Sequence, residues 1–327
     1  MLLRLMAFLV SFMLVFMVYA QDSILARPEA QHFIEEMVKK DHFTPWQVRH
    51  ILSQAHYQPI IIEKMNTPYE GKPWDIYQSL FLTSQRINQG VEFWQKHAGV
   101  LAFAEKKYGV PANIIVSILG VETTYGRQQG QFKVLDALST LAFYYPKRAP
   151  YFSYELREYL LMCRDFHLNP SAQIGSYAGA MGQGQFMPSS YRRWAVSYKG
   201  NAAPDIINNA DDAIVSVANY LNHHGWKPHQ NIASKAVVKY LHCRNLDVNA
   251  KKPLYTRTYL AHCGIQPEKF TWNNPTQVGL IEMMMSHQKA NEYWIGYPNF
   301  YVILTYNSSP LYGLAVYLLG SAIQSKV

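Results

Sequence analysis

A run of apolar residues at helical spacing ends in a glutamate. The run lies at positions i−8, i−7, i−4 and i−3 from Glu122, and consists of Ile114, Ile115, Ile118 and Leu119. This spacing predicts a helix with one buried face. A carboxylate at the end of that face is desolvated, which raises its pKa and suits it to general-acid chemistry. The alternative is a structural glutamate satisfied by an arginine or by backbone donors.

The rest of the chain predicts a mainly helical fold. Prolines mark helix starts at Pro28, Pro45 and Pro111, and glycines mark helix ends at Gly109 and Gly126. Further helical patterns cover residues 132–145, 153–166 and 211–225. Residues 227–270 are the least periodic, and within them "SKAVVKYL" and "PLYTRTYL" predict short strands. After residue 297 we expect a buried segment, a turn at 307–310 and a closing helix.

The first twenty residues predict export. They combine Arg4, an apolar run and a small-residue end at Ala20, which is typical of a cleaved signal peptide. The alternative is a membrane anchor, because the run approaches spanning length. No cysteine follows the run, and no later segment is long and apolar enough to span. We therefore expect no stable membrane anchor.

The net charge of +8 is compatible with attraction to an acidic polymer. The basic residues are scattered, and no zinc-finger or RRM signature accompanies them. We therefore predict no nucleic-acid partner.

The three cysteines predict one disulfide. Cys243 and Cys263 lie in the same irregular segment and are the expected pair, whereas Cys163 lies in a helical apolar pattern and is expected to be buried. The dipeptides His242-Cys243 and His262-Cys263 leave zinc as an alternative, but structural zinc ligands are rarely adjacent.

Several long blocks resemble lytic murein transglycosylases of the B type. The blocks are "YGVPANIIVSILGVETTYGR", "VLDALSTLAFYYPKRAPYF", "GSYAGAMGQGQFMPSSY", "DDAIVSVANYLNHHGW" and "GYPNFYVILTYNSSPLYGLAVYLLG". They are collinear with the family, and the resemblance covers roughly residues 30–325. It implies a mainly α (α+β) fold with a lysozyme-like helical catalytic core whose cleft binds peptidoglycan glycan strands.

The resemblance also implies the site residues. Glu122 would act as the acid and then as the base. The substrate-binding positions would be Ser176, Gln185, Tyr220, Tyr306, Asn307, Tyr312, Lys147 and Arg148. Each has a structural alternative: the glycine-rich segment could be only a tight turn, the tyrosines only core, the basic pair a solvated one, and Asn307 a turn cap.

A departure from the family pattern predicts that this chain has no cofactor. Some family members bind calcium in an acidic loop, and the equivalent residues 197–212 carry Lys199, Ala202 and Ala203 where acidic residues or glycine would help. We therefore predict no metal site. Because the lipid cysteine of some members is missing, we expect a soluble periplasmic form. Its partner would be peptidoglycan, and association with other cell-wall enzymes stays open.

We predict five segments and one reaction. The segments are a signal peptide (1–20), an N-terminal helical region (21–108), a lysozyme-like core (109–226), an irregular and β segment (227–270) and a C-terminal segment that returns to the core (271–327). The expected enzyme cleaves the MurNAc–GlcNAc bond without water and leaves 1,6-anhydroMurNAc ends. Asp136 is the nearest candidate for a second carboxylate. The alternatives are a lysozyme-type hydrolase, which needs two carboxylates, and an inactive peptidoglycan-binding scaffold.

Overall fold

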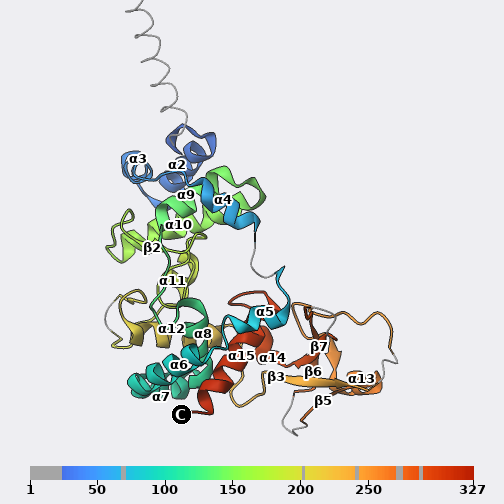
Figure 1. Ribbon diagram of the computed structural model, residues 1–327. Coiled ribbons are helices and arrows are strands. Elements are labelled where there is room, and N and C mark those ends of the chain that lie inside the picture. The colour runs from blue at the N-terminus through green and yellow to red at the C-terminus, as the bar shows by residue number, and fades with distance from the viewer. Residues whose placement is uncertain (1–23, 68–70, 201–202, 240–242, 270–274, 287–289) are drawn as a thin grey trace, which may run out of the picture. The chain divides into compact units, whose positions relative to one another are not determined.

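The computed structural model divides into two compact units (Figure 1). It describes residues 24–67, 71–200, 203–239, 243–269, 275–286 and 290–327. The first unit consists of residues 1–68 and 129–193, and the second of residues 69–128 and 194–327. The predicted signal peptide lies outside the described residues. In the part of the chain that is described, no helix is both long enough and apolar enough to cross a membrane.

The first unit is built from helices around α9 and α10. Its helices are α2 (Pro28–Asp41), α3 (Pro45–Leu52), α4 (Pro59–Asn66), α9 (Val134–Tyr144), α10 (Ala149–Asp165) and α11 (Pro188–Trp194), which ends at the unit boundary. Two short strands, β1 (Phe132–Lys133) and β2 (Ile174–Gly175), pair antiparallel. The α9 helix contacts α10, α2 and α4, so its almost wholly buried sequence forms the centre of this unit.

The first two helices begin where the sequence predicts. In α2 the apolar face of Phe33, Ile34 and Met37 is buried. Thr44 is the N-cap of α3: it accepts a hydrogen bond from the backbone N–H of Gln47, whose side chain accepts one from the Thr44 backbone. This capping box, with Pro45 following it, fixes the start of the helix.

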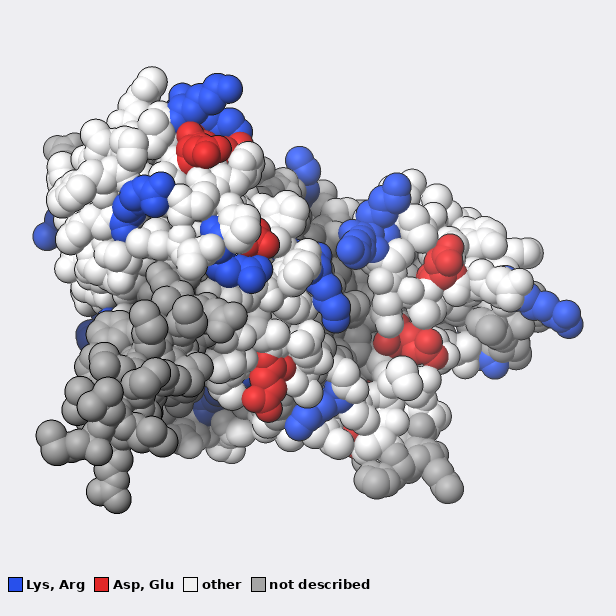
Figure 2. All heavy atoms as spheres, turned by 90° about the horizontal axis from the view of Figure 1, so that it is seen from above, with Lys and Arg blue, Asp and Glu red and all other residues white. Residues whose placement is uncertain are grey.

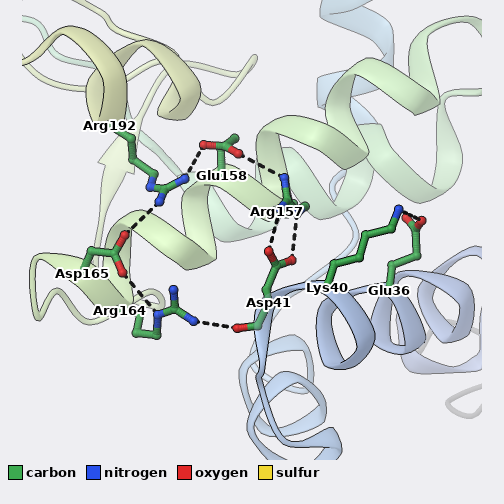
Figure 3. Close-up of polar contacts among 8 residues, drawn as sticks. All are labelled: Glu36, Lys40, Asp41, Arg157, Glu158, Arg164, Asp165 and Arg192. Carbon is green, nitrogen blue, oxygen red and sulfur yellow. Dashed lines mark hydrogen bonds and ion pairs between the residues drawn. The ribbon is translucent and has the colours of Figure 1, made fainter.

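Ion pairs connect three helices of the first unit (Figure 3). Arg157 on α10 donates two hydrogen bonds to Asp41 at the end of α2, at 2.7 and 2.6 Å. Arg192 on α11 bridges Glu158 and Asp165 of α10 at 2.6 and 2.9 Å. The carboxylates are thus shared between elements that are far apart in sequence.

The second unit contains the remaining helices. They are α5 (Trp74–Ser79), α6 (Ser84–Lys96), α7 (Ala98–Tyr108), α8 (Ala112–Thr123), α12 (Ala210–His223), α13 (Arg257–His262), α14 (Pro298–Ile303) and α15 (Pro310–Gln324). The α8 helix contacts α6, α7, α12 and α15. Its residues 112–120 are all buried, so the carrier of Glu122 is the central helix of this unit.

A five-stranded antiparallel sheet completes the second unit. Its strands are β3 (Ala233–Val238), β4 (Tyr255–Thr256), β5 (Ile265–Pro267), β6 (Gln277–Met283) and β7 (Glu292–Gly296), in the order β4-β6-β7-β3-β5. The predicted strand in "SKAVVKYL" is confirmed as β3, while "PLYTRTYL" supplies only the two residues of β4 before α13 begins. The sequence analysis missed β6 and β7, which pair with each other and join β4 to β3.

The cysteines behave as predicted. Cys243 and Cys263 form a disulfide with a Cα–Cα distance of 5.1 Å, and Cys163 is a buried free thiol. The disulfide joins the segment after β3 to the end of α13.

Charged residues are dispersed over one face of the protein. On the face seen in Figure 2, lysine and arginine side chains lie in separate places and alternate with aspartate and glutamate. This distribution agrees with the scattered basic residues of the sequence.

Candidate active site

Glu122 lies in the last turn of α8. The helix ends one residue later, and Thr124 and Tyr125 both adopt left-handed backbone conformations, with φ of 52° and 60°. The predicted stop at Gly126 lies one residue too late: the helix is capped by Thr124, and Gly126, at φ 83°, is the third left-handed residue and continues the reversal. The chain turns away directly after Glu122 because the carbonyls of Leu119 and Gly120 accept the N–H groups of Tyr125 and Thr124.

Arg86 and Tyr125 hold this helix end in place. The Arg86 guanidinium donates a hydrogen bond to the carbonyl of Gly120, and the Tyr125 hydroxyl donates one of 2.8 Å to the carbonyl of Arg86. A Cβ on Gly120 would lie 2.7 Å from the Tyr125 hydroxyl oxygen, so glycine at this position admits the ring. Sequence reasoning missed Arg86, because it lies 34 residues before the carbonyl that it contacts.

Tyr312 contacts the glutamate directly. Its hydroxyl, on the first turn of α15, donates a 2.7 Å hydrogen bond to Oε1 of Glu122. Burial raises the pKa of Glu122 to about 7, and the hydrogen bond from Tyr312 acts in the opposite direction. Near neutral pH the side chain is thus poised between carboxylic acid and carboxylate.

Two further predicted tyrosines lie beside Tyr312. The rings of Tyr306 and Tyr312 are parallel at a centroid distance of 6.5 Å, and Tyr220 meets Tyr306 edge-on at 4.9 Å. Burial, and next the charge of Glu122, raise the pKa of Tyr306 well above its ordinary value. The structure therefore brings Glu122 and these three tyrosines together.

A histidine packs against Tyr220, one of these three tyrosines. His224 stacks on Tyr220 at 3.9 Å, and its Nδ1 lies 2.7 Å from the Tyr220 carbonyl. The Tyr220 hydroxyl donates a 2.7 Å hydrogen bond to the carbonyl of Thr305, next to Tyr306. Sequence reasoning missed His224, although its i+4 spacing from Tyr220 on α12 was a usable signal.

Asn307 caps the turn that follows it, which was the structural alternative to a substrate contact. Its side-chain oxygen accepts a 3.0 Å hydrogen bond from the backbone N–H of Ser309, which closes the turn before α15. The turn sets the start of the helix that carries Tyr312. A substrate contact by Asn307 stays a prediction.

Ser176 and Gln185 lie in the first unit, in the glycine-rich segment. The Ser176 hydroxyl accepts the N–H groups of Ala178 and Ala180, at 3.2 and 3.1 Å. Gln185 has a left-handed φ of 50°, and its amide nitrogen donates to the carbonyls of Gln129 and Gly182. Its amide oxygen has no partner among the described residues, so it remains an available acceptor.

Lys147 and Arg148 also belong to the first unit. Both are exposed in the 3-10 turn Pro146–Arg148 that precedes α10. The Arg148 guanidinium lies over the rings of Tyr151 and Phe152, 4.5 and 5.1 Å from their centroids. The pair presents positive charge to solvent beside aromatic faces.

Asp136, the candidate second carboxylate, has a structural role in the first unit. It is buried on α9 and accepts hydrogen bonds from the His56 backbone N–H (2.9 Å) and the Gln58 side chain (3.3 Å). In the described chain, no carboxylate is among the groups that shift the pKa of Glu122.

Two of the three carboxylates in residues 197–212 accept backbone N–H groups of the same loop, and the third, Asp211, lies 2.8 Å from Nδ1 of His97. The two oxygens of Asp212 accept the N–H groups of Tyr198 (2.8 Å) and Asp205 (2.9 Å). Asp205 in turn accepts the N–H groups of Ile207 and Asn208. Calcium takes six to eight oxygen ligands, and the side chains of Asp205 and Asp212 offer at most four. Ala202 lies outside the described residues, and within them no group of three metal-ligating side chains occurs.

Comparisons with known proteins show which family this chain belongs to. The family model described as "Transglycosylase SLT domain" matches residues 26–321. The chain belongs to this family. It is 40% identical over 306 residues to membrane-bound lytic murein transglycosylase B of Escherichia coli (strain K12), a match that covers 90% of this chain and 82% of the relative.

Solved structures of the family give the same result. The lytic transglycosylase SltB1 from Pseudomonas aeruginosa superposes with a TM-score of 0.85 and 40% identity, over 91% of this chain and 98% of that chain. SltB3 from the same organism, solved in complex with NAG-NAM-pentapeptide, gives a TM-score of 0.76 and 26% identity, over 90% of this chain and 78% of that chain. The predicted family, fold class and enzyme class are therefore confirmed: this chain is a lytic transglycosylase with a mainly helical, lysozyme-like fold.

Proposed function

We propose that Glu122 is the single acid and base with which this enzyme cleaves the MurNAc–GlcNAc bond of peptidoglycan. The observation that carries the proposal is the hydrogen bond from Tyr312 to a glutamate whose pKa is about 7. A general acid works best when its pKa lies near the operating pH, and Glu122 meets that condition.

In the first step Glu122 is a proton donor. Its proton passes to the glycosidic oxygen as the bond from that oxygen to C1 of MurNAc breaks, and the GlcNAc portion leaves as an alcohol. The substrate's own N-acetyl group stabilises the positive charge at C1. Glu122 is then a carboxylate, and the hydrogen bond from Tyr312 stabilises this charged form.

In the second step Glu122 is a proton acceptor. It takes the proton of the C6 hydroxyl as that oxygen forms its bond to C1 and closes the 1,6-anhydro ring. The carboxylic acid is restored, and water neither enters nor leaves. One titratable group suffices for both steps, whereas hydrolysis by a typical glycosidase uses two carboxylates.

The other predicted residues bind the substrate in this proposal. Tyr220, Tyr306 and Tyr312 contact the saccharide around Glu122, and Asn307 contacts it from its turn. In the first unit, Ser176 and Gln185 contact the sugar, the latter through its available amide oxygen. Lys147 and Arg148 face the carboxylates of the peptide or lactyl group.

We further propose a soluble periplasmic enzyme that needs no calcium. The signal-peptide pattern of residues 1–20 supports export, and the internal use of Asp205 and Asp212 supports the absence of a metal. The proposed partner is the glycan strand of peptidoglycan.

Mass spectrometry of the fragments released from purified sacculi tests the proposal. The mature protein is compared with Glu122→Gln, and with Glu92→Gln as a control that changes an exposed glutamate of α6. We expect wild type and the control to release fragments one water lighter than reducing fragments, and Glu122→Gln to release none. Reducing ends would favour the hydrolase, and binding without release by wild type would favour the scaffold.

A further inference from the structure

A cavity opens in the unit that carries Glu122. Its volume is about 310 Å³, and it is lined by residues 71–73, Asn249, residues 282–285 and residues 309–311. This volume is at the lower end of the range for small-ligand sites, roughly 300–1,000 Å³. The lining comes from the segment before α5, the end of β6 and the start of α15, and it includes neither Glu122 nor Tyr312.

Hydrogen bonds hold the walls of this cavity in place. The Trp74 N–H donates to the carbonyl of Met284 at 2.7 Å, and the N–H of Ser286 donates to Asp75 at 2.9 Å. The Asn249 side chain accepts the N–H of Glu282 and donates to its carbonyl, at 3.0 and 2.9 Å. These bonds connect the α5 wall and Asn249 to the β6 wall, so this side of the cavity is preformed for a ligand.

The lining combines apolar surface with charges of both signs. Met284 is 69% exposed, and Pro310 and Leu311 add aliphatic surface. Lys72 contributes an ammonium group and Glu282 a carboxylate. A ligand that fits this lining carries small apolar groups together with both an anionic and a cationic group.

One carboxylate oxygen of Glu282 can accept a hydrogen bond from a ligand. Its Oε1 already accepts hydrogen bonds from Asn291 (3.0 Å) and the Tyr293 hydroxyl (2.8 Å), which orient the carboxylate. Its Oε2 has no hydrogen-bond partner among the described residues. An oriented carboxylate with one unused oxygen is suited to an ammonium group.

We propose that this cavity binds the peptide substituent of peptidoglycan. The inference rests on the proposed function, because the peptide is a substituent of the glycan strand that Glu122 would cleave; Lys147 and Arg148 would then face the lactyl carboxylate or the peptide of a neighbouring MurNAc. Leu311 in the cavity wall directly precedes Tyr312, which contacts Glu122. A short peptide carries the required apolar side chains, carboxylates and amine, and the relative SltB3 was solved with a glycan that bears a pentapeptide.

Two glycan substrates test this proposal. One is the peptide-bearing strand, and the other is the same strand after an amidase has removed its peptides. Glu282→Gln removes the charge but keeps an acceptor for Tyr293, and Leu311→Trp fills the cavity. Glu268→Gln, an exposed position outside the cavity lining, is the control.

We expect both cavity variants to lower kcat/KM on the peptide-bearing strand by roughly threefold to tenfold, the effect of losing one or two polar contacts. Cleavage of the peptide-free strand by the variants should equal that by wild type, and the control should match wild type on both. Equal losses on the two strands, or no loss on either, would overturn the proposal. Failure of the proposed function is distinct, because wild type would then cleave neither strand to anhydro products.

Discussion

The Tyr312 hydroxyl donates a 2.7 Å hydrogen bond to Glu122 Oε1 across 190 residues of sequence. The bond joins the last turn of α8 to the first turn of α15. Burial raises the pKa of the glutamate and this bond lowers it, so the value of about 7 is the balance of two opposed effects. Changing either partner should therefore move the pH dependence of the enzyme in a defined direction.

Tyr312→Phe should shift that pH dependence upward. Without the donor the carboxylate loses a hydrogen bond to a charged group, worth about 1.5–3 kcal/mol, so the pKa of Glu122 should rise by about one to two units. The base step loses the same stabilisation, and kcat should fall by about tenfold or more. A profile of kcat/KM against pH measures both effects. Tyr259→Phe, at an exposed tyrosine of α13, is the control and should leave the profile unchanged.

Glu122→Gln should stabilise the protein at alkaline pH. The folded state holds a proton on Glu122 up to about pH 7, whereas the unfolded chain releases it near its ordinary value of 4.5. The folded state thus binds more protons in this window, so the free energy of unfolding of wild type falls as pH rises from about 4.5 to 7. The loss is at most about 3 kcal/mol for a shift of this size. The free energy of unfolding of the glutamine variant should not fall in this way, because the glutamine does not titrate.

Urea unfolding at pH 4.5 and pH 8 measures the difference. The two proteins should be similar at the lower pH, and the variant should be the more stable at the higher pH. Parallel loss of stability in both proteins would show that Glu122 is not the group that titrates.

Local signals in the sequence are sufficient for much of this fold. Pro28 and Pro45 mark helix starts that the structure confirms, because prolines act on the neighbouring backbone only. The position of Glu122 at the end of an apolar stripe is also local information. The family resemblance added Tyr312, which no local pattern connects to Glu122.

Other features depend on contacts that the sequence does not display. In β6 the residues from Val278 to Ile281 are buried consecutively, so the alternation that identifies a strand is absent. The helix stop at Thr124 and Tyr125 uses left-handed conformations that these residue types rarely adopt, and hydrogen bonds through Arg86 and Gly120 hold them there. Contacts between residues far apart in the sequence determine both strand β6 and the end of helix α8.

The disulfide should be measurable by thiol titration. With Cys243 and Cys263 joined, unfolding without reductant should expose one thiol per chain, that of Cys163, and the folded protein should react slowly because this thiol is buried. A Cys243→Ser/Cys263→Ser variant should lose about 3 kcal/mol of stability, as expected for a loop of about this length. Three reactive thiols in the unfolded, unreduced protein would contradict the pairing.

Arg157→Met should destabilise the first unit. The change removes both hydrogen bonds to Asp41, whose carboxylate is buried at the end of α2 (Figure 3), and leaves a charge without its partner. Arg157 is itself partly exposed, so we expect a loss of about 2–3 kcal/mol, below the value for a fully buried pair. Urea unfolding of the variant measures the loss.

Lys40→Met is the matched control, because it breaks the ion pair with Glu36 in the same region and both side chains of that pair are exposed (Figure 3). Its effect should not exceed about 0.5 kcal/mol. Adding Asp41→Asn to Arg157→Met should restore part of the lost stability, because no unpaired charge then remains. If the double variant is no more stable than Arg157→Met, the loss comes from packing of the arginine side chain and not from the unpaired charge of Asp41.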